Sequence, residues 1–274
     1  MELMSRRDTP TEDIPVVILA GGLGTRLREE TERVPKPLVQ IGERPIIWHI
    51  MKLYGHFGFR RFVLCLGYKS HVLKEYFLRY REQLSDVTVH LSGNHEVTYH
   101  NQPADEDWEV TLAETGLLTG TGGRVHRVRE FIDTDTFMLT YGDGIGAVDL
   151  AALLDFHRGH DRLGTVTGVH PTSRYGELGL NGGNLVEEFN EKPTTPKDFV
   201  SGGFFVFQRE FLDYFDDEPG LLLEHDPLRN LSRDKELMLF AHTGFWMGMD
   251  TYREFDTLNK LWVRGEAPWK VWSD

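Results

Sequence analysis

The residues with the clearest potential for chemistry lie in a glycine-rich loop near the start of the chain, at positions 19–27 (LAGGLGTRL). Three glycines within four positions, Gly21, Gly22 and Gly24, let the backbone turn sharply and point successive N–H groups into one concavity. Such a concavity binds phosphate oxygens, and Arg26 adds a planar guanidinium with a permanent positive charge. Taken alone, the glycine run is equally compatible with a plain tight turn.

Two common nucleotide-binding glycine motifs are absent. A dinucleotide-binding loop, GxGxxG, that begins at Gly22 needs a glycine at position 27, where this chain has Leu27. A Walker A loop needs a Gly-Lys pair, and the chain contains none. The missing dinucleotide motif disfavours an NAD-dependent sugar dehydratase.

A lysine held between two prolines follows ten residues after Arg26. Pro35 and Pro37 restrict the backbone on either side of Lys36 and present its ammonium on a stiff segment. A fixed positive charge suits the neutralisation of an α-phosphate under attack. By itself this tripeptide is more typical of a surface loop, but its combination with the glycine loop favours a shared phosphate site.

The first part of the chain alternates apolar strand-like runs with segments of helical periodicity. We predict strands at 14–20, 62–66 and 87–91, and helices at 45–57 and 73–80. This β-α-β-α-β order predicts an α/β fold with a mixed, mostly parallel sheet flanked by helices. Ligands of such sheets bind in the crevice at the carboxyl ends of the strands, where the glycine loop lies.

The second part predicts a helix at 123–131, a strand at 137–141, a helix at 150–160, a hairpin-rich insert at 164–208 and a helix at 253–264. Asp143 directly follows the strand at 137–141, so we expect its carboxylate in the same crevice as the glycine loop.

The chain is predicted to form a single domain at 14–274, preceded by a disordered N-terminal extension at 1–13. A C-terminal helical extension, about 251–274, ends in the aromatic tail that contains Trp269 and Trp272. His157 and His160 lack partners at metal-binding spacing, and we expect them on the surface of a helix.

Composition excludes several classes of function. The net charge of −13 argues against binding of nucleic acid polymers, whose affinity depends on neutralising phosphates. No run of 18 apolar residues is present, so we predict no membrane span, and the first 13 residues do not resemble a signal peptide. The single cysteine, Cys65, rules out an intramolecular disulfide and fits a reducing cytoplasmic location.

The glycine loop followed by Pro35, Lys36 and Pro37 resembles the signature of the sugar-1-phosphate nucleotidylyltransferases. Segments similar to the glucose-1-phosphate cytidylyltransferase branch of that family continue almost to the C-terminus. They include 42–52 (GERPIIWHIMK), 140–144 (TYGDG), 202–206 (GGFFV) and 244–251 (GFWMGMDT).

This resemblance implies a Rossmann-like fold related to the GT-A glycosyltransferases. It also implies an Mg²⁺-dependent reaction in which a sugar 1-phosphate, here glucose 1-phosphate, attacks the α-phosphorus of CTP and releases pyrophosphate. Such phosphoryl chemistry depends on positioning and charge, because the attacking oxygen is already anionic. We also expect a homo-oligomer.

The resemblance assigns roles by position. Arg26 and Lys36 are the expected catalytic residues, holding the triphosphate and the α-phosphate respectively. Asp143 and Asp250 are the expected Mg²⁺ ligands, and Glu191 and Lys192 the expected sugar contacts. The expected nucleotide-binding residues are Leu19, Ala20, Gly21, Gly22, Gly24, Thr25, Thr119, Arg124 and Gly142.

Two positions depart from the family pattern. Val34 stands where a second basic residue is common, and Gly248 stands where a proline often precedes Met-Asp. The segment 114–120 (ETGLLTG) lacks the glutamine-rich Gly-Leu-Ala stretch of thymidylyl- and uridylyltransferases, which favours CTP. The same chemistry with UTP, dTTP or a modified sugar phosphate, and an inactive nucleotide-sugar sensor, remain as alternatives.

Overall fold

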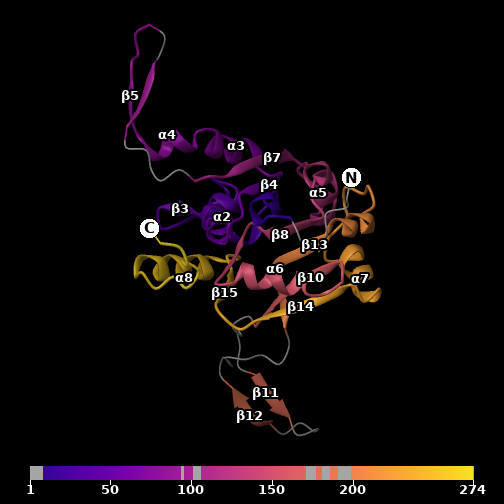
Figure 1. The fold of residues 1–274 in the computed structure, drawn as a ribbon. Helices are drawn as coiled ribbons and strands as arrows, with labels where there is room; N and C mark the ends of the chain where they lie inside the picture. The colour runs from indigo at the N-terminus through magenta and orange to yellow at the C-terminus, as the bar shows by residue number, and fades with distance from the viewer. Residues whose placement is uncertain are drawn as a thin grey trace.

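The computed structural model describes residues 9–93, 96–100, 106–170, 177–180, 186–190 and 199–273. Its centre is a seven-stranded sheet with the strand order β14-β10-β13-β8-β1-β4-β7 (Figure 1). The strands are β1 (Pro15–Leu19), β4 (Arg61–Leu66), β7 (Glu109–Glu114), β8 (Thr136–Tyr141), β10 (Gly164–Val169), β13 (Val200–Gln208) and β14 (Leu237–His242).

Only β13 runs opposite to its neighbours in this sheet. β1 is parallel to both β4 and β8, whereas β13 is antiparallel to β8 and β10. The five residues of β1 are all buried, as expected for a strand covered on both faces. The mixed, mostly parallel sheet predicted from the sequence is therefore confirmed.

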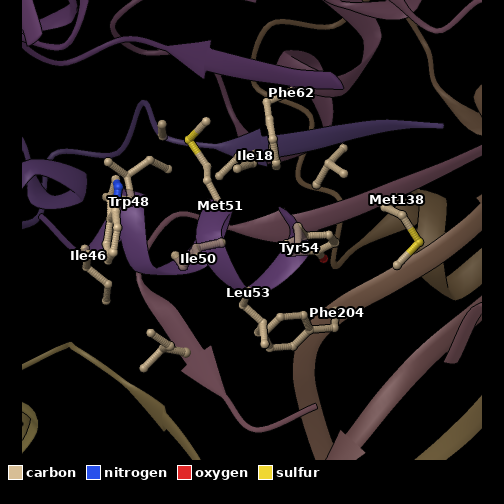
Figure 2. Close-up of a cluster of buried hydrophobic side chains, with 14 of the residues drawn as sticks. Ile18, Ile46, Trp48, Ile50, Met51, Leu53, Tyr54, Phe62, Met138 and Phe204 are labelled. Atoms are coloured by element: carbon tan, nitrogen blue, oxygen red, sulfur yellow. The ribbon is translucent and has the colours of Figure 1, made fainter. Parts of the chain in front are cut away.

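Helices cover both faces of the sheet. One apolar cluster contains side chains of α2 (Ile46–His56), α3 (Ser70–Leu78), α6 (Leu150–Arg158) and α8 (Tyr252–Val263). Figure 2 shows part of this cluster, where Leu53 and Tyr54 of α2 face Phe204 of β13. The opposite face is covered by α5 (Thr121–Arg127), a 3₁₀ segment (Arg209–Tyr214) and α7 (Asp226–Arg233).

The predicted C-terminal helix and its aromatic tail pack back onto α2. Trp269 is fully buried and lies 3.4 Å from His49 of α2, to which its indole Nε1–H donates. Asn259 of α8 accepts from the backbone N–H of Gly42 and donates to the carbonyl of Gln40. The extension is thus part of the core, and it is fastened to the segment that follows Lys36.

The prediction that residues 87–91 form the third strand of the central sheet is wrong. Asp86–Val89 forms β5, which among the described strands pairs with β6 (Val97–His100) alone, in a hairpin that projects from the body (Figure 1). The third parallel strand is β7, which the sequence analysis missed together with α7 and β14. The run at 87–91 alternates polar and apolar residues, a pattern typical of an exposed hairpin rather than of a strand buried on both faces.

Two further expectations need correction. Residues 1–8 lie outside the described part, but Thr11–Asp13 forms a 3₁₀ turn and the Thr9 carbonyl accepts from Arg158, so the predicted disordered extension does not include positions 9–13. His157 is not on the surface: it is fully buried between Thr165 and Gln208, and burial lowers its pKa to about 3.

Candidate active site

A cleft opens at the carboxyl ends of β1 and β8. It gathers residues from the glycine loop, from the Pro-Lys-Pro segment and from two later segments of the chain. The lining residues are Leu19, Ala20, Gly22, Gly24, Thr25, Arg26, Lys36, Pro37, Gly142, Asp143 and Asp250. The structure therefore brings together both predicted catalytic residues, both predicted metal ligands and six of the nine predicted nucleotide-binding residues.

Lys36 is the centre of this cleft. Its ammonium donates to Asp143 Oδ2 at 2.6 Å and to Asp250 Oδ1 at 2.9 Å. Its side chain is 11% exposed, whereas the two carboxylates are about one-third exposed. Burial alone lowers the pKa of Lys36, but the charges and hydrogen bonds of Asp143 and Asp250 outweigh it and raise the pKa, so the amine is charged at neutral pH.

A short strand pair brings the two carboxylates together across more than 100 positions of sequence. β9 (Gly144–Gly146) pairs with β15 (Trp246–Gly248) in antiparallel register, with Gly144 opposite Gly248. Directly beyond the pair, the Met249 N–H donates to the Asp143 carbonyl at 2.8 Å. The β9–β15 pair and the Met249–Asp143 hydrogen bond therefore hold the backbones of Asp143 and Asp250 close together. Gly248 lies opposite Gly144 at a non-hydrogen-bonded position of this pair, because the bonded position next to it joins Met249 to Asp143.

Arg26 contacts the second carboxylate oxygen of Asp250. Its Nη1 lies 3.1 Å from Asp250 Oδ2, but its side chain is 74% exposed. Arg26 therefore presents its charge at the mouth of the cleft, where water screens it, whereas the charge of Lys36 lies deeper.

Arg124 supports the glycine loop from beneath. Its buried guanidinium donates to the carbonyls of Gly21 and Leu66 and to the hydroxyl of Thr115. A Cβ on Gly21 would lie 2.1 Å from this guanidinium, so only glycine fits above it. Arg124 does not line the cleft, and its predicted contact with a nucleotide stays a prediction.

Two hydroxyl groups near the loop have structural partners. Thr31 donates to the carbonyls of Gly24 and Leu27, and so closes the loop behind the left-handed turn at Gly24, whose φ is 63°. Sequence analysis missed Thr31, which carries no motif of its own. Thr119 is buried and accepts from Arg127, so its predicted nucleotide contact is also untested. Glu191 and Lys192 lie outside the described residues.

The carboxylate pair suits a divalent cation. Asp143 and Asp250 offer oxygen ligands that already converge on one ammonium, and Mg²⁺ is commonly held by one or two carboxylates together with substrate phosphates. In the described part of the chain, no group of three or more His, Cys, Asp or Glu side chains is arranged to hold a metal. A cation here would thus complete its coordination with water or with substrate oxygens.

Comparison with known proteins matches this arrangement. A family model described as "Nucleotidyl transferase" matches residues 15–255. The chain is 46% identical over 257 residues to the glucose-1-phosphate cytidylyltransferase of Salmonella typhimurium, covering 93% of this chain and 98% of that protein. It is 42% identical to a probable glucose-1-phosphate cytidylyltransferase of Bacillus subtilis, covering 93% of this chain and 99% of that protein.

The chain belongs to the nucleotidyl transferase family. A solved structure of a putative glucose-1-phosphate thymidylyltransferase from Bacillus anthracis, 18% identical, superposes with a TM-score of 0.66 over 90% of this chain and 94% of that one. The Rossmann-like, GT-A-related fold expected of this nucleotidyl transferase is thereby confirmed. No helix in the described part of the chain is both long and apolar enough to cross a membrane.

The position of Arg124 in this nucleotidyl transferase generates a stability prediction. Arg124→Met should lower the free energy of unfolding by about 1–3 kcal/mol, because buried carbonyls lose their charged donor. Arg129→Met removes the same charge from an exposed position nearby and should leave stability within about 0.5 kcal/mol. Urea unfolding followed by circular dichroism measures both. An Arg124→Met protein of normal stability that no longer binds CTP would instead make Arg124 a direct nucleotide contact.

Proposed function

We propose that this enzyme transfers the cytidylyl group of CTP to glucose 1-phosphate, forming CDP-glucose and pyrophosphate. The observation that carries the proposal is the convergence of Lys36, Arg26, Asp143 and Asp250 beside the glycine loop in one cleft. The choice of CTP and glucose rests on the similarity to cytidylyltransferases over nearly the full length of both chains.

The reaction exchanges one phosphorus–oxygen bond for another. An anionic phosphate oxygen of glucose 1-phosphate attacks the α-phosphorus of CTP, and the bond to the bridging oxygen of the β-phosphate breaks. The electron pair of that bond leaves with pyrophosphate. Because the nucleophile is already anionic, the site needs no general base, and its task is to align the two phosphates and stabilise charge.

Each part of the cleft has a place in this task. The backbone of 19–24 forms the concavity for the nucleotide, and Gly142 lets the end of β8 pack closely against it, since a Cβ there would lie 3.0 Å from the Leu19 carbonyl. Lys36 supplies a nearly buried charge suited to the α-phosphate, and exposed Arg26 a charge suited to the outer phosphates.

We propose Mg²⁺ as the cofactor, held by Asp143 and Asp250. When bound, the ion would supply positive charge to the phosphates, in addition to that of the protein's own residues. Glu191 and Lys192 remain the proposed sugar contacts, and Thr119 and Arg124 the proposed further nucleotide contacts. We also propose a cytoplasmic location, where nucleoside triphosphates are available.

The substrate assignment predicts the outcome of a substrate panel. With Mg²⁺, CTP and glucose 1-phosphate should give CDP-glucose and pyrophosphate with the highest kcat/KM among five nucleoside triphosphates and several sugar 1-phosphates. Pyrophosphate release measures the rate, and mass spectrometry identifies the nucleotide sugar. A UTP or dTTP reaction tenfold faster than that of CTP would refute the base assignment. The absence of turnover with every pair would favour the nucleotide-sugar sensor.

Substitution of Lys36 and substitution of Arg26 should change different kinetic constants. Charge builds on the α-phosphoryl group mainly in the transition state, whereas the outer phosphates are charged throughout binding. Lys36→Met should lower kcat by about 10²–10³ with a small change in the KM for CTP. Arg26→Met should raise that KM by the larger factor, with some loss of kcat.

Steady-state kinetics across CTP concentrations decide between these roles, after circular dichroism has shown that both variants fold. Lys52→Met is the matched control, because it breaks a 2.8 Å lysine–carboxylate pair with Glu106 that lies outside the cleft. A Lys36→Met enzyme with normal kcat and a raised KM would make Lys36 a binding residue only.

We further propose that the enzyme is a homo-oligomer and that the β5–β6 hairpin takes part in its interface. Val87, Val89 and Val97 are 40–45% exposed on this hairpin, and Leu91 beyond β5 is 79% exposed. A two-stranded hairpin is marginally stable on its own, so a projecting one with an apolar surface is best explained by contact with a second copy.

The proposed interface predicts a change of oligomeric state. The double variant Val89→Asp/Leu91→Asp should form smaller assemblies than the natural chain in size-exclusion chromatography with light scattering, because charge opposes burial of this surface. Val263→Asp, which alters another highly exposed valine at the end of α8, should not. A natural chain that is monomeric at every concentration would refute the oligomer, and an unchanged double variant would exclude the hairpin.

A further inference from the structure

We propose that Lys36 acts as an exchangeable counter-charge, which holds the Asp143–Asp250 pair until CTP draws its ammonium onto phosphate and thereby opens the pair to the divalent cation. The inference deepens the proposed function and depends on it for the identity of the nucleotide. It makes metal binding and nucleotide binding one coupled event.

The first observation is geometric. One ammonium contacts one oxygen of each carboxylate, Asp143 Oδ2 at 2.6 Å and Asp250 Oδ1 at 2.9 Å, and so occupies the place where the two carboxylates converge. A divalent ion between Asp143 and Asp250 and the ammonium of Lys36 cannot share these oxygens closely, because two positive charges a few ångströms apart repel one another strongly in a partly buried site.

The second observation is the balance of charge. Among the residues that the structure describes, two aspartates face two cations, Lys36 and Arg26, and the Asp250 carboxylate contacts both of them. The pair is therefore already neutralised by the protein, and a metal ion must displace part of that charge to bind. Most of the competition comes from Lys36, because Arg26 is 74% exposed and its charge is screened.

The third observation is that the cleft can offer the Lys36 ammonium other anionic partners. The glycine loop and Gly142 line the same cleft as the ammonium, so a triphosphate bound there brings new anionic partners to Lys36. Pro35 and Pro37 stiffen the backbone, which confines the exchange to rotations of the lysine side chain. The phosphates of the nucleotide then accept the hydrogen bonds of the Lys36 ammonium. The two carboxylates that the ammonium leaves can then bind the metal ion that accompanies the phosphates.

The inference predicts that loss of a catalytic cation strengthens metal binding. Lys36→Met protein without nucleotide should bind Mn²⁺, an EPR-visible substitute for Mg²⁺, at least about tenfold more tightly than the natural protein. Arg26→Met should give a smaller gain. Lys52→Met, which frees Glu106 outside the cleft, should leave the affinity unchanged. Adding Asp143→Asn to Lys36→Met should abolish the gain and so locate the bound ion.

A second measurement tests the coupling itself. CTP should raise Mn²⁺ affinity by a larger factor in the natural protein than in Lys36→Met, because only the natural protein has a counter-charge to release. Mn²⁺ affinity that is unchanged or weaker in folded Lys36→Met overturns the inference and makes Lys36 a permanent partner of the aspartates. Turnover by the natural enzyme separates a failure of this inference from a failure of the proposed function. If CDP-glucose forms but Lys36→Met does not bind Mn²⁺ more tightly, only this inference is refuted. If Lys36→Met binds Mn²⁺ more tightly but no CDP-glucose forms, only the proposed function is refuted.

Discussion

The structure depends on one electrostatic constraint: three charged groups from distant parts of the chain must meet in a partly buried cleft. Lys36 is nearly buried, and its charge is tolerable only because Asp143 and Asp250 lie within hydrogen-bonding distance. Without both partners its charge would be uncompensated, which costs several kcal/mol in buried sites. The surrounding fold must therefore hold three separate backbone segments in a fixed relation.

Several connections hold those segments in place. β9 and β15 pair directly beside the two aspartates, and the Met249 N–H bonds to the Asp143 carbonyl. Helix α8 starts just after Asp250 with a capping box formed by Thr251 and Glu254. Farther along α8, Asn259 binds the backbone on either side of Ile41, in the segment that follows Lys36. The C-terminal helix thus links the aspartate segment to the lysine segment.

The glycine loop is constrained in a different way, by close approach rather than by charge. Arg124 fills the space beneath Gly21 and binds its carbonyl, while Thr31 binds the carbonyl of Gly24. The loop can then keep its upper face for a ligand, because its lower face is satisfied by the protein. The cleft combines a rigid anion-binding backbone with an ammonium whose partners can change, a combination suited to a reaction that depends on charge and alignment.

The sequence by itself determined the loop, the stiff lysine and the buried strands, because each of these is a local property of residue type and spacing. Gly21, Gly22 and Gly24 required no long-range information, and neither did the apolar runs of β1, β4 and β8. Family resemblance singled out Asp250, but no local pattern could place it beside Asp143. Only tertiary structure placed Glu109–Glu114 beside β4, since this run is short and mixed in polarity and no local pattern marks it as a strand of the central sheet. It also decided that Arg124 lies under the loop and that Lys36 lies between two aspartates, because both depend on strand pairing across about 100 residues or more.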